Sequence, residues 1–516
     1  MHLNVLLESV RRKFPEKEAL VYGSRRITYR ELESASRRAA EVFRREGVRP
    51  GDRVAVMTYN SPGFVIAAFG VWRAGGVLVP VNHKLTAPEV EYTIGHSGAR
   101  VGVVSADLVD AARGGAPQTR WLLTEMATHG GAGGDAADDF DAAVDAAPEW
   151  EGVDGGEGSE DAVAQILYTS GTTSAPKGCV HTHRSIASVP PLIVATVGLE
   201  RDDRFLLAMP IWHASPLNNW MLTTLFLGGT VVLLREYHPI QFLETVQRER
   251  ITAFFGAPIA YLAPVQIAKA QGLDLSSYDL SSVRRWLYGG APIGAETAQL
   301  LARVYGSEDF YQVYGMSEMG PVGTALYPHE QIEKAGSIGR GGMPGVDLRV
   351  VRADGTDAGP GETGEIWLSA DTRMRGYLDN DAATEDVFDG RWYRSGDVAR
   401  IDADGYLFIV DRLKDVVITG GENVYSQEVE EAIRPHDDIL DVAVIGRPHP
   451  EWGETVVAVV VPVEGRTLEL EDLRAYLSDK LARYKMPREL VLVDTLPRNP
   501  SGKLTKHVLR DAVFPQ

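Results

Sequence analysis

Residues 167–178 gather in one stretch the side chains best suited to binding a phosphorylated ligand. They read Leu-Tyr-Thr-Ser-Gly-Thr-Thr-Ser-Ala-Pro-Lys-Gly and follow an apolar run, 163–167, that predicts a β-strand. Small residues let backbone N–H groups converge on an anion, while hydroxyls and a lysine add donors and positive charge. The pattern is not that of a P-loop, because no second glycine stands directly before Lys177 and no Ser or Thr follows it. The stretch predicts a phosphate-chain site, with a flexible surface loop as the alternative.

Two acids follow tight glycine turns further along the chain. Residues 311–318 read Tyr-Gln-Val-Tyr-Gly-Met-Ser-Glu, and residues 393–397 read Tyr-Arg-Ser-Gly-Asp. A carboxylate such as that of Glu318 suits Mg²⁺, which takes hard oxygen ligands and bridges phosphates. A carboxylate such as that of Asp397 can accept hydrogen bonds from ribose hydroxyls. A solvated acid at a turn is the alternative at each position.

Glycine turns and cations complete the set of candidate motifs. Residues 288–292 read Tyr-Gly-Gly-Ala-Pro at the end of a predicted strand, where open α/β sheets bind ligands. Residues 411–415 read Asp-Arg-Leu-Lys-Asp, residues 418–425 read Ile-Thr-Gly-Gly-Glu-Asn-Val-Tyr, and residues 497–503 read Pro-Arg-Asn-Pro-Ser-Gly-Lys. A lysine on a loop framed by proline and glycine can reach across a cleft as a point charge. Taken singly, these stretches also fit a turn, a charged helix end and a frayed terminal loop.

In this order, and over residues 28–509, the motifs resemble those of the adenylate-forming superfamily. Its members include acyl-CoA synthetases, peptide-synthetase adenylation domains and firefly-luciferase-like proteins. Two positions depart from the family pattern, because Asp411 stands where many relatives have glycine and Ser426 where relatives usually have proline. Ser426 can act as a helix N-cap, so we expect the following helix to start there all the same.

The resemblance implies a role for each motif. Lys503 stabilises the charge that develops between the substrate carboxylate and the α-phosphate, and Glu318 holds Mg²⁺ together with Thr169. Tyr314 stacks on adenine, Asp397 binds ribose, and the glycine turn at 420–421 lines a pantetheine tunnel. The residues expected to contact ATP, Mg²⁺ or coenzyme A are Thr169, Ser170, Gly171, Thr172, Thr173, Lys177, Gly289, Gly290, Ala291, Pro292, Tyr311, Tyr314, Gly315, Met316, Ser317, Asp397, Arg412, Lys414, Gly420, Gly421 and Glu422.

The same resemblance predicts the acyl pocket. No Asp or Glu occurs in residues 205–234 or 251–273, so nothing there pairs with the ammonium of an α-amino acid. His213 joins Lys503 and Glu318 as a catalytic candidate, with a gating or packing role, because the substrate carboxylate is already ionised. Asn218 and its neighbour Asn219 could bind a polar group on the acid, face solvent or cap a helix. The residues expected to line the pocket are Trp212, His213, Asn218, Phe255, Tyr261, Gly290 and Gly315.

The elements that must position these residues alternate between strands and helices. Strands are predicted at 54–57, 77–79, 101–104, 163–167, 251–255 and 283–288, with helices between them and capping boxes at Thr28 and Thr86. Such alternation predicts an α/β fold with doubly wound parallel sheets. A helix, two glycines and a strand occur around both Gly75 and Gly228, which suggests two related subdomains. Short alternating strands from 348 on predict a small β-rich subdomain.

The last hundred residues predict an α+β domain of their own, with helices at 426–433 and 470–481 and strands at 442–445 and 456–461. We expect an N-terminal AMP-binding domain at 1–411, a hinge at 412–415 and a mobile C-terminal lid domain at 416–516. Residues 110–161, rich in Ala, Gly and Asp, predict a long surface excursion with little core.

Composition limits the classes of function. The 516 residues are 44% hydrophobic and 24% charged, as in soluble globular proteins. A net charge of −19 argues against nucleic acid as a partner, and the single cysteine, Cys179, excludes an internal disulfide framework. Residues 205–234 carry no charge, but Pro210, Pro216 and paired glycines favour a strand, a loop, a helix and a strand over a membrane span. We expect a cytoplasmic protein without an integral membrane segment, as a monomer or homodimer.

The sequence therefore predicts an ATP-dependent acid–thiol ligase. We expect a carboxylic acid to be activated as an acyl-adenylate with release of pyrophosphate, and then transferred to coenzyme A with release of AMP. A stand-alone ligase that loads an acyl carrier protein is the alternative. A luciferase-like oxidative enzyme and a non-catalytic nucleotide-binding regulator are more distant alternatives, and the presence of Glu318, Asp397 and Lys503 counts against the regulator.

Overall fold

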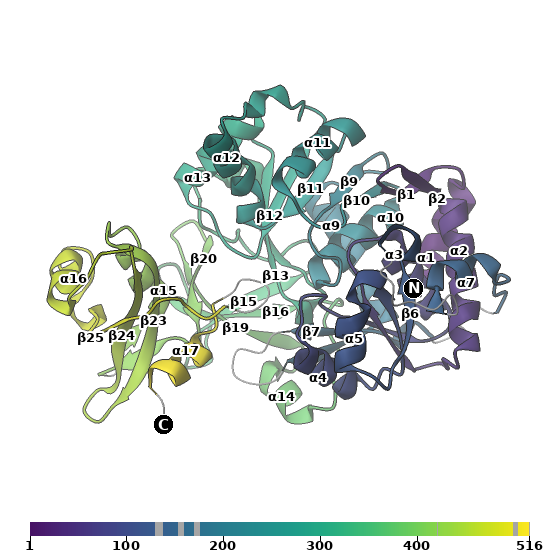
Figure 1. Ribbon diagram of the computed structural model, residues 1–516. Coiled ribbons are helices and arrows are strands. Elements are labelled where there is room, and N and C mark those ends of the chain that lie inside the picture. Colours follow the sequence, from purple (N-terminus) through teal and green to yellow (C-terminus); the bar gives the residue numbers. More distant parts are fainter. Residues whose placement is uncertain (130–137, 153–158, 170–175, 421, 499–503, 515–516) are drawn as a thin grey trace. The chain divides into compact units, whose positions relative to one another are not determined.

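The computed structural model describes residues 1–129, 138–152, 159–169, 176–420, 422–498 and 504–514. These residues form two compact units (Figure 1). The first unit takes in Met1–Thr169, Pro176–Leu348 and Leu368–Tyr393. The second takes in Arg349–Trp367 and the described residues from Arg394 on.

A seven-stranded sheet carries the strand that leads into the predicted phosphate loop. Its strands follow the order β17-β8-β7-β4-β3-β5-β6. The pairs of β3 with β4 and β5, of β4 with β7 and of β5 with β6 are parallel, while β8 runs antiparallel to β7 and β17 antiparallel to β8. The strands are β3 (Arg53–Met57), β4 (Val77–Pro80), β5 (Val101–Ser105), β6 (Arg120–Thr124), β7 (Val163–Thr169), β8 (Lys177–Thr182) and β17 (Gly376–Tyr377).

Helices connect and cover these strands. The N-terminal end of α2 (Tyr29–Arg45) carries the predicted capping box at Thr28, and α4 (Ala87–Ser97) carries the one at Thr86. Helix α3 (Pro62–Arg73) is buried on every side, as its apolar sequence requires, and packs against α2. The other helices beside this sheet are α5 (Val109–Gly115), α6 (Met126–His129) and α7 (Phe140–Ala146).

An eight-stranded sheet forms the other half of the first unit. Its order is β14-β13-β12-β11-β9-β10-β1-β2, with antiparallel strands only at the two edges. An aromatic core that includes Phe254, Tyr261, Trp286 and Phe310 packs against it. The strands are β1 (Glu18–Tyr22), β2 (Arg25–Thr28), β9 (Arg204–Leu207), β10 (Thr230–Leu233), β11 (Ala253–Gly256), β12 (Arg285–Gly289), β13 (Phe310–Gly315) and β14 (Gly323–Leu326).

The helices of this half are mostly short and apolar. Residues 204–234 form β9, a π-helix, α10 and β10, as the sequence predicts, and in the part of the chain that the structure describes no helix combines the length and hydropathy of a membrane span. The helices are α1 (Leu3–Lys13), α8 (His183–Ala187), α9 (Val189–Val197), the π-helix Ser215–Leu222, α10 (Thr223–Leu227), α11 (Pro239–Glu249), α12 (Pro258–Gln271) and α13 (Ala295–Tyr305).

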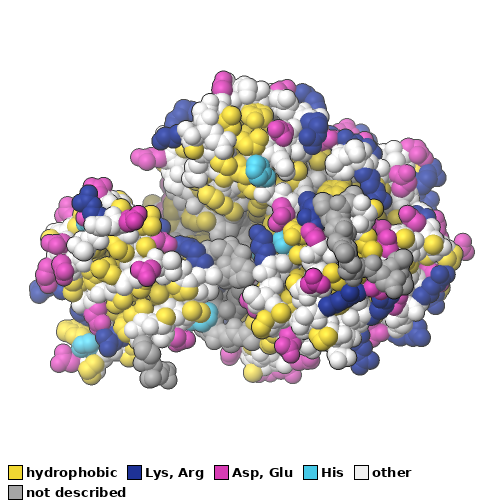
Figure 2. Space-filling model, viewed as in Figure 1, with side chains coloured by type: hydrophobic (Ala, Val, Ile, Leu, Met, Phe, Trp, Pro, Cys, Tyr) yellow, Lys and Arg dark blue, Asp and Glu magenta, His cyan; other side chains and the backbone are white. Residues whose placement is uncertain are grey.

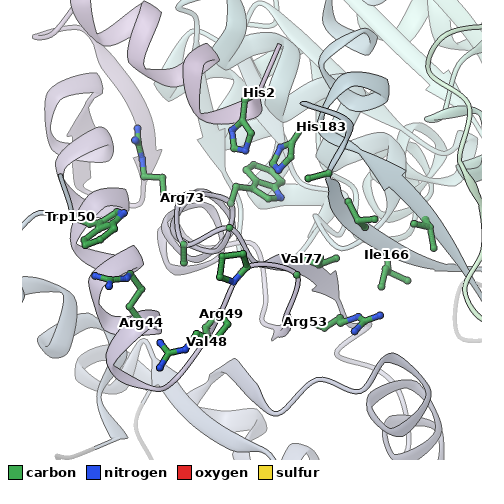
Figure 3. Close-up of a pocket in the computed structure, with 18 of the residues that line it drawn as sticks. His2, Arg44, Val48, Arg49, Arg53, Arg73, Val77, Trp150, Ile166 and His183 are labelled. Carbon is green, nitrogen blue, oxygen red and sulfur yellow. The ribbon is translucent and has the colours of Figure 1, made fainter. Parts of the chain in front are cut away.

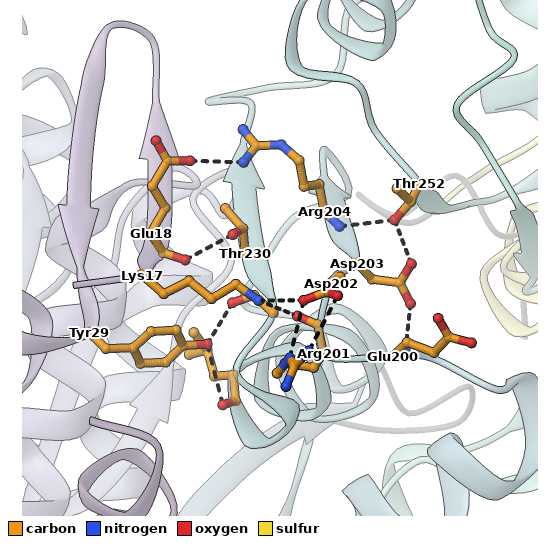
Figure 4. A network of polar contacts seen from close by, with 12 residues as sticks. Lys17, Glu18, Tyr29, Glu200, Arg201, Asp202, Asp203, Arg204, Thr230 and Thr252 are labelled. Atoms are coloured by element: carbon orange, nitrogen blue, oxygen red, sulfur yellow. Dashed lines mark hydrogen bonds and ion pairs between the residues drawn. The ribbon is translucent and has the colours of Figure 1, made fainter. Parts of the chain in front are cut away.

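Polar contacts fix the amino ends of the central strands of this sheet (Figure 4). The guanidinium of Arg204 donates to the Glu18 carboxylate at 2.8 Å, and the Thr230 hydroxyl donates to the backbone oxygen of Glu18 at 2.8 Å. The hydroxyl of Thr252 donates to Asp203 at 2.6 Å and accepts from the Arg204 N–H at 2.9 Å. Buried polar groups that are satisfied in this way set the register of β1, β9, β10 and β11.

The second unit is built around two smaller sheets. One has the order β15-β16-β19-β18, with β20 paired to β19, and the other the order β22-β21-β24-β23, with β25 paired to β24. Strands β15, β16 and β19 of these sheets begin or end in the first unit, and β18 lies within it. The strands are β15 (Asp347–Val351), β16 (Thr363–Ser369), β18 (Phe388–Asp389), β19 (Trp392–Ile401), β20 (Leu407–Arg412), β21 (Val417–Thr419), β22 (Glu422–Val424), β23 (Ile439–His449), β24 (Gly453–Pro462) and β25 (Glu489–Leu492).

Helix α15 (Ser426–Ile433) and the shorter-than-predicted α16 (Leu470–Leu477) pack on the core of the C-terminal sheet. Helix α17 (Lys506–Val513) lies near the C-terminus, and α14 (Asp381–Val387) lies in the first unit. The α/β fold with two doubly wound halves and a β-rich part is confirmed.

The predicted surface excursion at 110–161 is partly wrong. Strand β6 adds to the edge of the first sheet with Trp121, Leu122 and Leu123 buried, and Phe140 of α7 is buried as well. The short apolar run of β6 is masked in the sequence by the Ala, Gly and Asp around it.

On the face shown in Figure 2, acidic and basic side chains are interspersed over the first unit.

Candidate active site

Glu318 lies just after the end of β13, in the short 3₁₀ turn Ser317–Met319. The turn needs glycine before it, because a Cβ at Gly315 would lie 2.6 Å from the backbone oxygen of Pro321. The Nε2 atom of His181 lies 2.7 Å from the backbone oxygen of Ser317, and the hydroxyl of Tyr377 donates to the Glu318 carboxylate at 2.9 Å. The carboxylate is thereby held in place by a phenol.

Lys177 approaches the same tyrosine. It opens β8 directly opposite Thr169, the last residue of β7, and its Nζ lies 4.9 Å from the centre of the Tyr377 ring. The Thr169 hydroxyl donates to the backbone oxygen of Lys177 at 3.4 Å. Burial and the nearby Glu318 charge raise the pKa of Tyr377 far above its ordinary value, so the phenol stays neutral and keeps its proton for Glu318.

A cation, a phenol and a carboxylate are thus gathered where β7, β8, β13 and β17 end or begin. Mg²⁺ in phosphate sites takes one or two protein carboxylates and fills its other positions with phosphate oxygens and waters. The single carboxylate of Glu318 is enough for a Mg²⁺ ion whose other ligands are phosphate oxygens and waters. Among the residues described, no group of three His, Cys, Asp or Glu side chains could hold a metal ion. Ser170, Gly171, Thr172 and Thr173 lie outside the described residues.

The glycine turn 289–292 and Tyr314 lie at the carboxyl ends of neighbouring parallel strands, and Tyr311 lies near the start of the second strand, β13. Gly289 of β12 pairs with Val313 of β13, and a Cβ at Gly289 would lie 2.7 Å from the Val313 oxygen. Gly290 has φ +84°, which other residues rarely adopt. Ala291 and Pro292 are exposed, while Tyr311, Tyr314, Met316 and Ser317 are half-buried.

The aromatic pair Trp212–His213 follows β9. The two rings lie 3.7 Å apart between centres, and the indole N–H of Trp212 donates to Nδ1 of His83 at 3.2 Å. Phe255, near the end of β11, stacks on Trp220 at 5.1 Å. The sheet therefore presents aromatic side chains at the ends of β9 and β11, and their role in an acyl pocket stays a prediction.

Asn218 and Asn219 lie in the π-helix and are 0% and 2% exposed. The solvent-facing and helix-capping alternatives are therefore wrong for both. Asn218 accepts from the Gln165 amide at 3.1 Å, and Asn219 donates to the Pro321 oxygen at 3.0 Å. Both residues lie within a π-helix, a rare form of helix that is found mostly at functional sites.

Tyr261 lies in the aromatic core, with 0% of its surface exposed. Its hydroxyl donates to the Leu287 oxygen at 2.6 Å, and it packs edge to face against Phe254, Trp286 and Tyr305. A substrate contact of Tyr261 remains a prediction, since these neighbours already enclose the ring and engage its hydroxyl.

In the second unit, Asp397 and Arg412 face each other across β19 and β20. They are directly paired in the ladder, and Nε of Arg412 lies 2.5 Å from the Asp397 carboxylate. Lys414 follows in a turn, where burial lowers its pKa to about 8. Gly420 has φ +61°, and Glu422 is exposed on β22, while Gly421 and Lys503 lie outside the described residues.

The two departures from the family pattern contact each other. The carboxylate of Asp411 accepts from both the backbone N–H and the hydroxyl of Ser426, the latter at 2.7 Å. Ser426 is the first residue of α15 and Tyr425 is the N-cap, so the predicted N-cap role of Ser426 is wrong. A carboxylate near a helix N-terminus satisfies a free N–H and the helix dipole, so Asp411 caps this helix from another element.

The sequence motifs include neither Tyr377 nor His83, because a lone tyrosine in a two-residue strand and a lone histidine in a loop carry no pattern. A cavity of about 600 Å³ at the amino ends of β3, β4 and β7 contains none of the predicted site residues (Figure 3). Arg44, Arg49, Arg53 and Arg73 line it together with the stacked rings of His2 and His183. This cavity lies at the end of the strands opposite to Thr169.

Comparisons with known proteins agree with this geometry. Residues 7–378 match the AMP-binding enzyme family, and residues 428–503 match the AMP-binding enzyme C-terminal domain. The chain is 38% identical to a feruloyl-CoA synthase of Amycolatopsis sp over 97% of this chain and 96% of the relative. It is 34% identical to the long-chain-fatty-acid–CoA ligase FadD13 of Mycobacterium tuberculosis over 94% and 93%.

Solved structures are similar over the whole length. ATP-bound MatB from Rhodopseudomonas palustris has a TM-score of 0.85 at 30% identity and covers 100% of this chain and 99% of its own. The o-succinylbenzoate CoA synthetase of Bacillus subtilis in complex with its acyl-adenylate has a TM-score of 0.83 at 28% identity, with 98% of both chains covered.

Proposed function

This chain belongs to the AMP-binding enzymes, in the acyl-CoA synthetase branch of the adenylate-forming superfamily, and from that premise we propose how it works. It is an AMP-forming acid–CoA ligase with two half-reactions. The observation that best supports a working first half-reaction is the group of Lys177, Tyr377 and Glu318 beside the end of β7. A phosphate chain that reaches this group meets a cation and a carboxylate able to hold a metal ion.

In the first half-reaction, a carboxylate oxygen of the acid attacks the α-phosphorus of ATP. A new O–P bond forms, the bond to the bridging β-phosphate oxygen breaks, and pyrophosphate leaves. Such phosphoryl chemistry depends on positioning and charge neutralisation. Lys177 binds the phosphate chain, Lys503 stabilises the charge at the α-phosphate, and bound Mg²⁺, held by Glu318 and Thr169, would neutralise the phosphate oxygens.

In the second half-reaction, the thiolate of coenzyme A attacks the acyl carbon of the adenylate. The C–O bond to AMP breaks, so a thioester and AMP are the products. Asp397 and Arg412, paired across β19 and β20, bind the ribose, and the turn at Lys414 is the pivot between the two steps. The glycine turn at 420–421 lines the path of the pantetheine.

The acid is a monocarboxylate with an apolar or weakly polar tail. Trp212, His213 and Phe255 offer aromatic surface at the ends of β9 and β11, and Asn218 offers a buried amide. The absence of Asp and Glu from residues 205–234 and 251–273 leaves an α-ammonium unpaired, which costs several kcal/mol when buried. Relatives named for feruloyl, indoleacetate and long-chain fatty acids are consistent with such acids.

One rival differs only in the thiol. The chain is 33% identical to a fatty acid–[acyl-carrier-protein] ligase of Streptomyces coeruleorubidus, over 96% of this chain and 93% of the relative. Coenzyme A is preferred because the other relatives named above are CoA ligases. A cytoplasmic location and a monomeric or homodimeric state complete the proposal.

The test is a panel of fatty and aryl acids, each paired with its α-amino analogue, with ATP and Mg²⁺. Pyrophosphate release should require an acid, and thioester should form only when coenzyme A is added. We expect kcat/KM for each α-amino analogue to be at least ~100-fold lower, as an unpaired buried charge predicts. Comparable kcat/KM for an amino acid would contradict the proposed acid, and thioester formation with a carrier protein alone would favour the rival.

A further inference from the structure

His83 reaches the acyl site from the other half of the first unit. It lies in the loop after β4, in the seven-stranded sheet, whereas Trp212 follows β9 of the eight-stranded sheet. The Trp212 indole N–H donates to Nδ1 of His83 at 3.2 Å, and the rings meet edge to face. The His83 side chain is only 6% exposed. This hydrogen bond joins a loop of one sheet to the aromatic pair on the other.

The direction of the hydrogen bond from Trp212 fixes the tautomer of the His83 imidazole. An indole N–H can only donate, so Nδ1 of His83 must carry a lone pair and the ring proton must lie on Nε2. Burial, followed by the positive charges of Lys84 and Arg235, lowers the pKa of His83 to about 4, and Asp107 opposes this. The Glu236 carboxylate lies 3.7 Å from Nε2. His83 is therefore a neutral acceptor at neutral pH.

The backbone before Trp212 is held from the same side. The Asn60 side chain, 2% exposed and just after β3, accepts from the N–H of Ile211 at 2.8 Å. It donates to the backbone oxygens of Met209 at 3.1 Å and Leu234 at 2.9 Å. Asn60 thus fixes the main chain that leads into Trp212, and the Trp212 side chain is left to be oriented by another contact.

The ring of His83 is itself fixed. Tyr59 packs against it at 4.5 Å between ring centres, and the Arg235 guanidinium lies 3.7 Å over the Tyr59 ring. Arg235 in turn is paired with Asp107 at 2.7 Å. A side chain that is packed on one face and bonded at Nδ1 gives the indole one preferred orientation, and the ring of His213 lies on that indole.

We propose that His83 is a positioning residue of the acyl site, which sets the orientation of the Trp212 indole and thereby selects the tail of the acid. The inference rests on the proposed function, since it assigns Trp212 to the acyl pocket. Loss of the acceptor frees the indole to rotate, which weakens binding of the preferred acid and admits tails of other shapes. ATP, bound beside Lys177 and Glu318, is not affected.

The experiment compares His83→Leu, His83→Gln, Trp212→Phe and the His83→Leu/Trp212→Phe double variant across the same acid panel. Leucine removes the acceptor, glutamine restores one through its amide oxygen, and phenylalanine removes the donor but keeps a ring. We expect His83→Leu to raise KM for the best acid about fivefold to tenfold, as for one lost hydrogen bond, with KM for ATP changed less than about twofold. His83→Gln should recover most of the loss.

The double variant shows whether His83 acts by positioning Trp212 or by a general effect on the structure. If His83 acts through the indole, the double variant is no worse than the poorer single variant, because the bond can be lost only once. The proposal would be overturned if the effects of the two single variants on KM for the acid added up in the double variant, or if KM for ATP rose equally. It would also be overturned if His83→Gln were as impaired as His83→Leu. His329→Leu, at an exposed histidine, is the matched control, and thermal unfolding verifies that each variant is folded.

The proposed function can fail separately. If the wild-type chain released no pyrophosphate with any acid, the ligase assignment would fall while the role of His83 stayed measurable. Calorimetry would then measure how tightly each variant binds the panel acids. Lower acid affinity in His83→Leu and in Trp212→Phe, with no further loss in the double variant, would support the proposal. Equal acid affinity in all variants would overturn it.

Discussion

At the scale of single residues, Tyr377 connects the two charged groups of the phosphate site. Its hydroxyl holds the Glu318 carboxylate, and its ring faces the Lys177 ammonium. Glu318 therefore has one oxygen fixed by a neutral donor, and in the proposed mechanism its other oxygen would hold the metal ion. A bond to a charged acceptor contributes about 1.5–3 kcal/mol, more than a neutral bond does.

We therefore expect Tyr377→Phe to lower kcat/KM for MgATP by about 10-fold or more in the first half-reaction, because Glu318 loses its fixed orientation. The ring, and with it the contact to Lys177, is kept. Pyrophosphate release at varied Mg²⁺ measures the effect, with the exposed Tyr484→Phe as control. An unchanged Mg²⁺ dependence would separate Tyr377 from metal binding.

Lys503 belongs to the last sequence motif, and we propose that it acts in the first half-reaction only. We expect Lys503→Ala to reduce adenylate formation by about 100-fold or more, as for other groups that stabilise transition-state charge. Thioester formation from synthetic acyl-adenylate and coenzyme A should be spared. Equal losses in both half-reactions of the folded variant would show that the assigned role is wrong.

At the scale of elements, the turn after β20 is held by backbone hydrogen bonds on both sides of Lys414. Leu413 donates to the Gly396 oxygen at 2.8 Å, and Asp415 and Val416 donate to the Arg412 oxygen at 2.8 and 3.1 Å. The ladder of β19 and β20 ends at Arg412. A rotation that begins at Lys414 would therefore leave the Asp397–Arg412 pair, which we propose binds ribose, intact.

We expect Lys414→Pro to spare adenylate formation and to block thioester formation, because proline fixes φ and restricts the residue before it. ATP–pyrophosphate exchange measures the first step, and synthetic adenylate with coenzyme A measures the second. Lys414→Ala removes the same charge but keeps the backbone free, so it should retain the second step. Normal overall turnover of the proline variant would remove the hinge assignment.

At the scale of the whole molecule, the second unit contains a buried cluster of charges. The Lys506 ammonium lies 2.6 Å from both the Glu430 carboxylate and the Ser426 hydroxyl, and Ser426 is bonded to Asp411. Burial raises the pKa of Asp411 and of Glu430, and the Lys506 charge opposes the rise. Because the folded form holds these protons more tightly, the contribution of both acids to stability is full at low pH and falls as pH rises above the ordinary carboxyl range.

Lys506→Met should therefore destabilise the folded protein by about 3–5 kcal/mol at neutral pH, since two buried carboxylates lose their cation. The loss should shrink towards pH 5, where the acids of the variant take up protons. Chemical unfolding at several pH values measures it, and Lys480→Met, at an exposed lysine, is the control. A loss of stability that does not depend on pH would contradict the role of the two acids.

The sequence by itself determined the α/β class, much of the alternation of strands and helices, and the place of described residues such as Gly289 and Glu318 at a strand end or turn. Hydrophobic period, caps and glycine turns are local signals, so they can be read from neighbouring residues, as at Thr28, Thr86 and Gly315. The order of its motifs also pointed to the activity, through their resemblance to the adenylate-forming superfamily.

Only the tertiary structure decided which distant residues meet. The contacts of Tyr377 with Glu318, His83 with Trp212, and Asp411 with Ser426 span 59, 129 and 15 positions. None of these contacts can be predicted from neighbouring residues, because they depend on the order of strands in a sheet and on how separate elements pack together. For the same physical reason β6 was hidden: its buried Trp121, Leu122 and Leu123 gain their stability from pairing with β5, not from the polar sequence around them.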